Sequence, residues 1–145
     1  MGCDIHAVLE RHFEDEGWQL VAEVTGSADS RDYEFFTHLC GVRTNWQDMG
    51  DWPEPKGIPE DISPVTRWKI DNWGDDGHSH SWDTARDFIE KKLALSRIRN
   101  DKDADVSFAW FAYKALGYSC DDQEREDERH DCFVDRYRVV YWFDN

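Results

Sequence analysis

Two short segments of the sequence each carry a pair of potential metal ligands. Asp4 and His6 are two positions apart in an alternating segment, so both side chains project from one face of a strand. His78 and His80 form a second pair, which an extended backbone presents side by side. Carboxylate oxygens and imidazole nitrogens suit zinc or manganese better than calcium. The two pairs together predict a four-ligand metal site, provided that the fold brings them together.

A cation held by these residues would make the site hydrolytic. A bound divalent ion lowers the pKa of its water and polarises a phosphoryl or carbonyl oxygen, while a neighbouring acid or base moves the protons. Asp83 and Asp144 are the candidate catalytic carboxylates, and Asp144 is also a candidate fifth ligand. The leading prediction is therefore a metal-binding domain of the small hydrolase or phosphoesterase class.

The same four residues have a purely structural interpretation. Asp4 and His6 would then be polar residues on the solvent face of an edge strand. His78 and His80 would lie in a polar loop, with Ser79 or Ser81 capping the next helix. In this alternative the side chains form a hydrogen-bonded network that fixes the two ends of the fold and binds no metal.

Three further residues are candidates for binding an anionic ligand. Arg31 and Arg43 stand out on an acidic background, and a guanidinium can pair with carboxylate or phosphate. Salt bridges to nearby aspartates are the alternative. Trp82, which with Trp73 flanks the second histidine pair, is predicted to wall a pocket together with Trp73, although core packing is the more common role of tryptophan.

The charge balance excludes one broad class of function. The chain has 32 acidic and 17 basic residues and a net charge of −15. Such a surface repels nucleic-acid phosphates and anionic lipid, so we expect neither direct nucleic-acid binding nor membrane binding. The charge also allows a non-enzymatic alternative. In it a binding protein acts on a host protein, either as an acidic nucleic-acid mimic or by sequestering a small anionic ligand.

The cysteines and the first residues indicate the compartment. Four cysteines occur without a CxxC pair, and the opening Met1–Asp4 lacks the basic and apolar regions of a signal peptide. We therefore expect reduced thiols in the cytoplasm. Cys3 points to the opposite strand face from His6, so it is predicted to be buried behind the site.

The chain length suits one domain, residues 1–145. Strands at both ends and helices between them predict an α+β fold, with a small, mainly antiparallel sheet and about three helices packed on one face. The two terminal strands are expected to pair. The expected strands are 3–10, 18–25, 65–70 and 136–143, the helices are 32–40, 81–97 and 105–116, and the longer loops are 43–64, 71–80 and 120–131.

Several sequence blocks together resemble a group of small uncharacterised proteins found mostly in phage and prophage genomes. The most specific blocks are the opening MGCDIH at 1–6 and HSHSW at 78–82, and the others are Arg31–Tyr33, Gly41–Arg43, Gly57–Asp61 and Phe143–Asn145. The acidic stretch 120–131 departs from the pattern. The resemblance implies a phage or bacterial cytoplasmic setting and no particular activity.

Overall fold

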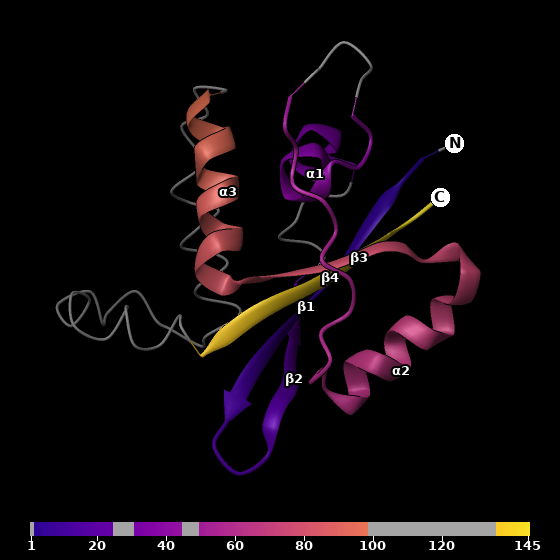
Figure 1. Ribbon diagram of the computed structural model, residues 1–145, viewed down its shortest axis with the longest axis vertical. Coiled ribbons are helices and arrows are strands. Elements are labelled where there is room, and N and C mark those ends of the chain that lie inside the picture. Colours follow the sequence, from indigo (N-terminus) through magenta and orange to yellow (C-terminus); the bar gives the residue numbers. More distant parts are fainter. Residues whose placement is uncertain (1, 25–30, 45–49, 99–135) are drawn as a thin grey trace, which may run out of the picture.

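The computed structural model describes residues 2–24, 31–44, 50–98 and 136–145 (Figure 1). These residues contain a four-stranded antiparallel sheet in the order β2-β1-β4-β3. The strands β1 and β4 form its centre, with Asp4 opposite Asp144, which confirms the predicted pairing and the α+β class. The strands are β1 (Asp4–Phe13), β2 (Gly17–Glu23), β3 (His78–Thr84) and β4 (Tyr137–Asp144).

Alternation along the two central strands sends side chains into two separate cores. Cys3, Ile5, Ala7 and Leu9 pack in the larger core with Val139, Tyr141 and Phe143 of β4. On the other face, Val8 packs with Val140 and Trp142 in a smaller core. Because both faces are covered, β4 is buried from Tyr137 to Phe143.

Helices α1 (Tyr33–Cys40) and α3 (Ala85–Ile98) cover the larger core. Helix α1 begins where predicted because the Asp32 carboxylate accepts the Phe35 backbone N–H at 3.2 Å. It ends at Gly41, whose φ of 67° is the left-handed conformation that glycine adopts without strain. Local capping signals therefore fix both ends of this helix.

Helix α2 (Pro64–Trp73) packs over the smaller core, on the opposite side of β3 and β4 from α1 and α3 (Figure 1). Two expectations were wrong here, because residues 65–70 are helical and the helices lie on both faces. The Ser63 hydroxyl accepts the Thr66 backbone N–H, and Pro64 occupies the first turn, where its missing N–H costs nothing. These two residues therefore start a helix at a place predicted as a strand.

The segment 78–84 was also assigned wrongly, since it is strand β3 and not a loop followed by a helix. It pairs with β4, with a bulge between His78 and Ser81 where Ser79 has a φ of 52°. Helix α3 therefore begins only at Ala85, and Ser81 is a buried strand residue instead of a cap. The open edge of β4 overrides a local sequence that is polar and loop-like.

Other expectations lie outside the described residues, namely the helix at 105–116 and the charged loop at 120–131. None of the helices in the described ranges is long and apolar enough to cross a membrane.

Candidate functional site

The end of the sheet where β1 begins and β4 finishes gathers several of the predicted residues. The Asp144 carboxylate accepts the Asp4 backbone N–H at 3.1 Å, and its other oxygen lies 2.9 Å from His6 Nε2. The side chains of His6 and Asp144 are 21% and 16% exposed, so the pair is sheltered but reachable. Since an ionised carboxylate only accepts hydrogen bonds, this contact places the His6 proton on Nε2 and leaves Nδ1 as an acceptor.

Arg31 holds the second carboxylate at this end. Its Nε and one terminal nitrogen lie 2.8 Å and 3.4 Å from the two Asp4 oxygens. This hydrogen bonding lowers the pKa of Asp4 and raises that of Arg31. Arg31 has a φ of 66°, a left-handed conformation that costs a non-glycine residue roughly 1–2 kcal/mol. Strained residues of this kind concentrate at functional sites.

Arg43 lies at the same end and also has left-handed backbone, with a φ of 59°. Its guanidinium stands 5.6 Å from the centre of the Tyr33 ring, whose hydroxyl accepts the Cys3 backbone N–H at 3.2 Å. Burial raises the pKa of the Cys3 thiol, although a hydrogen bond from Arg43 opposes that shift. Cys3 itself is fully buried, as predicted.

The second histidine pair reaches this end of the sheet from β3. His78 lies opposite Phe143, which in turn lies opposite Ile5, so these three residues form one row across the sheet. His78 Nδ1 lies 2.9 Å from the Ser79 hydroxyl. Within the described ranges, the Nε2 atoms of His78 and His80 are buried without a hydrogen-bond partner. Burial, reinforced by His78, lowers the pKa of His80.

The two histidine pairs share one end of the sheet but do not converge on one point. Strand β4 runs between β1 and β3, and two steps of strand spacing put the backbones of the two pairs about 10 Å apart. Trp142 of β4 stacks on His6 with the ring centres 5.7 Å apart. Trp142 and His80 both lie close to Gly77, because a methyl group added to Gly77 would be 3.5 Å from the Trp142 ring and 3.6 Å from His80 Nε2. In the part of the chain that the structure describes, no three His, Cys, Asp or Glu side chains are arranged to hold a metal.

Two tryptophans form the aromatic wall of this site, and neither is Trp82. Trp73 of α2 packs on His6 with the ring centres 4.1 Å apart, and Trp142 stacks on His6 from the neighbouring strand β4. Trp82 instead packs against the smaller core, under the Lys56 ammonium at 4.8 Å. No pattern in the sequence indicated Trp142, because only the strand register shows that it lies opposite His6.

The two candidate catalytic carboxylates lie far apart. Asp144 is opposite Asp4, whereas Asp83 is opposite Val139 of the same strand β4. Five residues of strand separate the two positions by about 17 Å, so both carboxylates cannot act on one atom. Asp83 is buried and accepts hydrogen bonds from Tyr141, Lys56 and Lys91, residues that the sequence did not single out.

A buried ion pair that the sequence did not reveal crosses the smaller core. The Glu10 carboxylate lies 2.7 Å from an Arg138 nitrogen and also accepts hydrogen bonds from Thr66 and Ser63. Arg138 also forms an ion pair with Asp61, which lies in the segment before α2, with the two atoms 2.7 Å apart. This network ties α2 and its preceding loop to the sheet.

No protein-family model matches the chain, and no curated protein or solved structure matches it. Function is therefore inferred from the contacts among the described residues.

Proposed function

We propose that the protein is a small hydrolase of the phosphoester class, and that His6 and Asp144 form its acid–base pair. The observation that carries the proposal is the 2.9 Å contact between His6 Nε2 and Asp144. Arg31, which holds Asp4, and Arg43, which lies against Tyr33 and Cys3, are at the same end of the sheet, and both have left-handed backbone conformations. Paired His and carboxylate groups transfer protons, and guanidinium groups bind phosphate oxygens.

In the proposed mechanism each group has a separate role. Asp144 fixes the orientation of the His6 ring and stabilises the imidazolium that forms when Nδ1 takes a proton. A water molecule that gives up this proton attacks phosphorus, and the bond from phosphorus to the leaving oxygen breaks. The leaving oxygen keeps the electron pair and takes a proton from solvent, and the imidazolium returns its proton to solvent. Arg31 supplies positive charge for the phosphoryl oxygens, and Arg43 adds positive charge from the Cys3 side of the same sheet end. Trp73 and Trp142 limit the access of solvent to the ring.

A divalent metal ion, zinc or manganese, is a second candidate ligand of this sheet end. It is favoured by the two buried imidazole nitrogens, Nε2 of His78 and of His80, which have no partner within the described ranges. A buried nitrogen without a hydrogen bond costs about 1–3 kcal/mol, and coordination to a cation would recover this cost. Asp4 and His6 could join such a site only by releasing Arg31 and Asp144.

Phosphate binding and hydrolysis test the main proposal. The wild-type protein should bind inorganic phosphate in a calorimetric titration and hydrolyse members of a panel of phosphomonoesters and phosphodiesters. His6→Gln should lower hydrolysis about 100-fold or more, the usual worth of a general base. Arg43→Met should weaken phosphate binding. His12→Gln is the matched control, because His12 lies at the far end of the same strand and packs edge-to-face on Trp18.

Two results would contradict the proposal: a wild-type protein that neither binds phosphate nor hydrolyses any ester, or a His6→Gln variant as active as wild type. Elemental analysis tests the metal separately. Near-stoichiometric zinc or manganese that disappears in a His78→Ala/His80→Ala double variant would support the second ligand. No metal after reconstitution under reducing conditions would contradict it.

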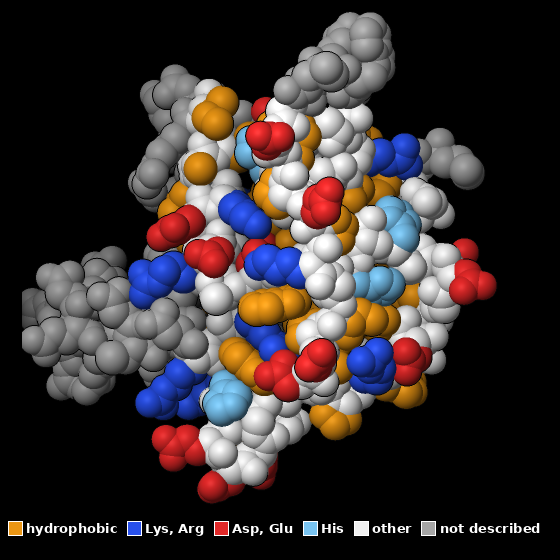
Figure 2. Space-filling view, viewed as in Figure 1, with side chains coloured by type: hydrophobic (Ala, Val, Ile, Leu, Met, Phe, Trp, Pro, Cys, Tyr) orange, Lys and Arg blue, Asp and Glu red, His pale blue; other side chains and the backbone are white. Residues whose placement is uncertain are grey.

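The nucleic-acid mimic has less support than the hydrolase. On the face shown in Figure 2, acidic side chains are interspersed with lysine and arginine and do not form one continuous patch. The phage or bacterial cytoplasmic setting and a host protein partner remain predictions from the sequence. A mimic would bind a basic partner with an affinity that falls steeply with salt concentration.

A further inference from the structure

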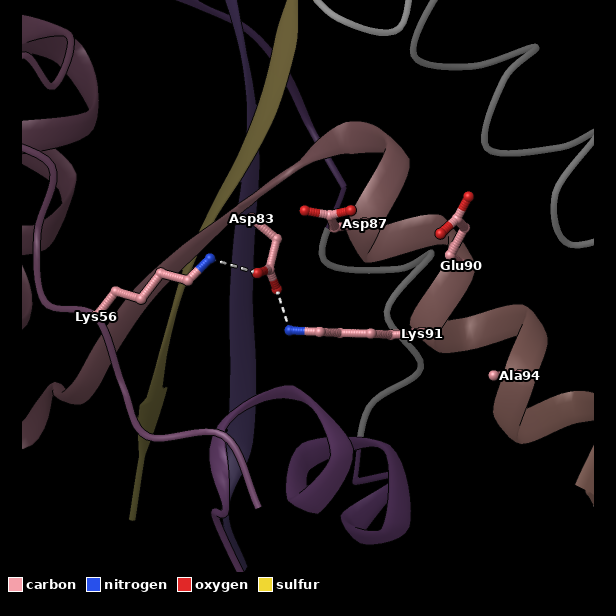
Figure 3. A pocket seen from close by; sticks show the side chains of 6 residues that line it. All are labelled: Lys56, Asp83, Asp87, Glu90, Lys91 and Ala94. Carbon is pink, nitrogen blue, oxygen red and sulfur yellow. Dashed lines mark hydrogen bonds and ion pairs between the residues drawn. The ribbon is translucent and has the colours of Figure 1, made fainter. Parts of the chain in front are cut away.

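A second polar site lies where β3 leads into α3, toward the other end of β4 from the His6–Asp144 pair (Figure 3). It is a shallow pocket, open to solvent, with a volume of about 420 Å³, which is in the range of small-molecule sites. The residues that line it are Lys56, Asp83, Asp87, Glu90, Lys91 and Ala94.

The floor of this pocket is a buried aspartate held by two lysines. Asp83 is 1% exposed, and its two carboxylate oxygens lie 2.8 Å from Lys56 Nζ and 2.9 Å from Lys91 Nζ. Figure 3 shows the two lysines reaching Asp83 from different elements. The Tyr141 hydroxyl donates a third hydrogen bond at 2.9 Å. Two ammonium groups and one carboxylate leave one positive charge in excess.

Both lysines keep hydrogen-bonding capacity for a ligand. An ammonium has three donors. Lys56 uses two of them, one on Asp83 and one on the Trp82 carbonyl at 2.9 Å. Lys91 makes one short contact to Asp83 and a long one of 3.5 Å to the Leu39 carbonyl. A ligand carboxylate could therefore bridge the two ammonium groups and balance the excess charge.

The rim of the pocket has the opposite charge. Asp87 and Glu90 are exposed and three positions apart on α3, so they lie on one helix face. Within the described ranges neither carboxylate has a hydrogen bond or ion pair. A simple anion would meet repulsion at this rim, and a simple cation would meet repulsion at the floor.

We infer that this pocket binds a small zwitterion of the amino-acid type. The ligand carboxylate bridges Lys56 and Lys91, and its ammonium group contacts Asp87 or Glu90. The site is independent of the proposed hydrolase site, because Asp83 and Asp144 are about 17 Å apart along β4.

Isothermal titration calorimetry on the full chain tests the inference with five probes. Glycine, β-alanine and 4-aminobutyrate vary the separation of the two charges, and acetate and methylamine each carry one charge alone. At least one zwitterion should bind ten times more tightly than acetate and methylamine. Lys91→Met and Glu90→Gln should each weaken that binding at least tenfold. Lys69→Met is the control, since Lys69 pairs with Glu23 on the other face of the sheet.

Glu90→Gln keeps the test decisive if Lys91→Met disturbs folding, because Glu90 is exposed and no described residue pairs with its carboxylate. His6→Gln should leave zwitterion binding unchanged, which separates this inference from the proposed hydrolase. The inference is overturned if no zwitterion binds, if acetate binds as tightly, or if Glu90→Gln binds like wild type.

Discussion

Replacing Arg138 by methionine should destabilise the protein severely. The substitution keeps the length of the side chain and removes its charge, so Glu10 loses its counter-ion while remaining fully buried. Removing one partner of a buried ion pair typically costs about 3–5 kcal/mol. Loss of the guanidinium 4.1 Å over the Trp18 ring adds about 0.5–1 kcal/mol. The contact to Asp61 adds little, because that carboxylate is 67% exposed.

The expected total is about 4–6 kcal/mol, a large part of the roughly 5–15 kcal/mol that stabilises a typical domain. At about 2–4 °C per kcal/mol, the midpoint of thermal unfolding should fall by roughly 10–20 °C. Urea unfolding with linear extrapolation measures the free energy directly. Arg136→Met is the matched control, because Arg136 is exposed beside the same strand and should change stability by less than about 0.5 kcal/mol.

A double variant separates a buried charge from a general packing defect. Glu10→Gln added to Arg138→Met removes the unpaired charge and should recover about 2 kcal/mol or more. A loss below about 1 kcal/mol in Arg138→Met, or strictly additive losses in the double variant, would refute the reasoning about desolvated charge.

Three further predictions concern single residues. Gly41→Ala should cost about 1–2 kcal/mol in urea unfolding, because an alanine is strained at a φ of 67°, and unchanged stability would contradict this. Burial lowers the pKa of His80 from its ordinary 6.5, so the unfolded chain takes the proton first as the pH falls. The midpoint of thermal unfolding should therefore drop between pH 7 and pH 5, and it should drop less in the His80→Gln variant. An equal drop in the wild type and the variant would argue against a buried imidazole. Burial raises the pKa of the Cys40 thiol to about 12 and also raises the pKa of Cys3. In a variant that lacks the other two cysteines, neither thiol should therefore react with Ellman's reagent at pH 8 until urea unfolds the chain. Rapid reaction of the native protein would show that these thiols are accessible.

Local signals were sufficient for the elements that the sequence placed correctly. Helix α1 has an aspartate cap and a terminal glycine, and β1 alternates cleanly between two faces. Residues 78–84 have no such signal, because their strand conformation depends on the edge of β4. Residues 64–73 did have one in Ser63 and Pro64, which start a helix, but the prediction of a short strand at 65–70 did not take it into account.

The sequence predicted only those contacts of the candidate site that follow from pairing the first and last strands. Pairing the first and last strands brings Asp4 and His6 to Asp144, as the structure shows. It does not reveal that Trp142 separates the two histidine pairs, because that depends on which strand lies between them. The contacts of Asp83 with Lys56 and Lys91 join three elements, and no spacing along the chain encodes them.

The pairing of β1 with β4 also sets the order in which the protein can fold during synthesis. Asp4 and Asp144 are 140 positions apart, so the centre of the sheet cannot form until almost all of these residues have left the ribosome. The hairpin of β1 and β2 is local and can form first, whereas β3 has no sheet neighbour until β4 arrives. Closing so long a loop is entropically costly, and such non-local pairing slows folding. We therefore expect nascent chains that stop before β4 to expose apolar strand faces and to depend on chaperones.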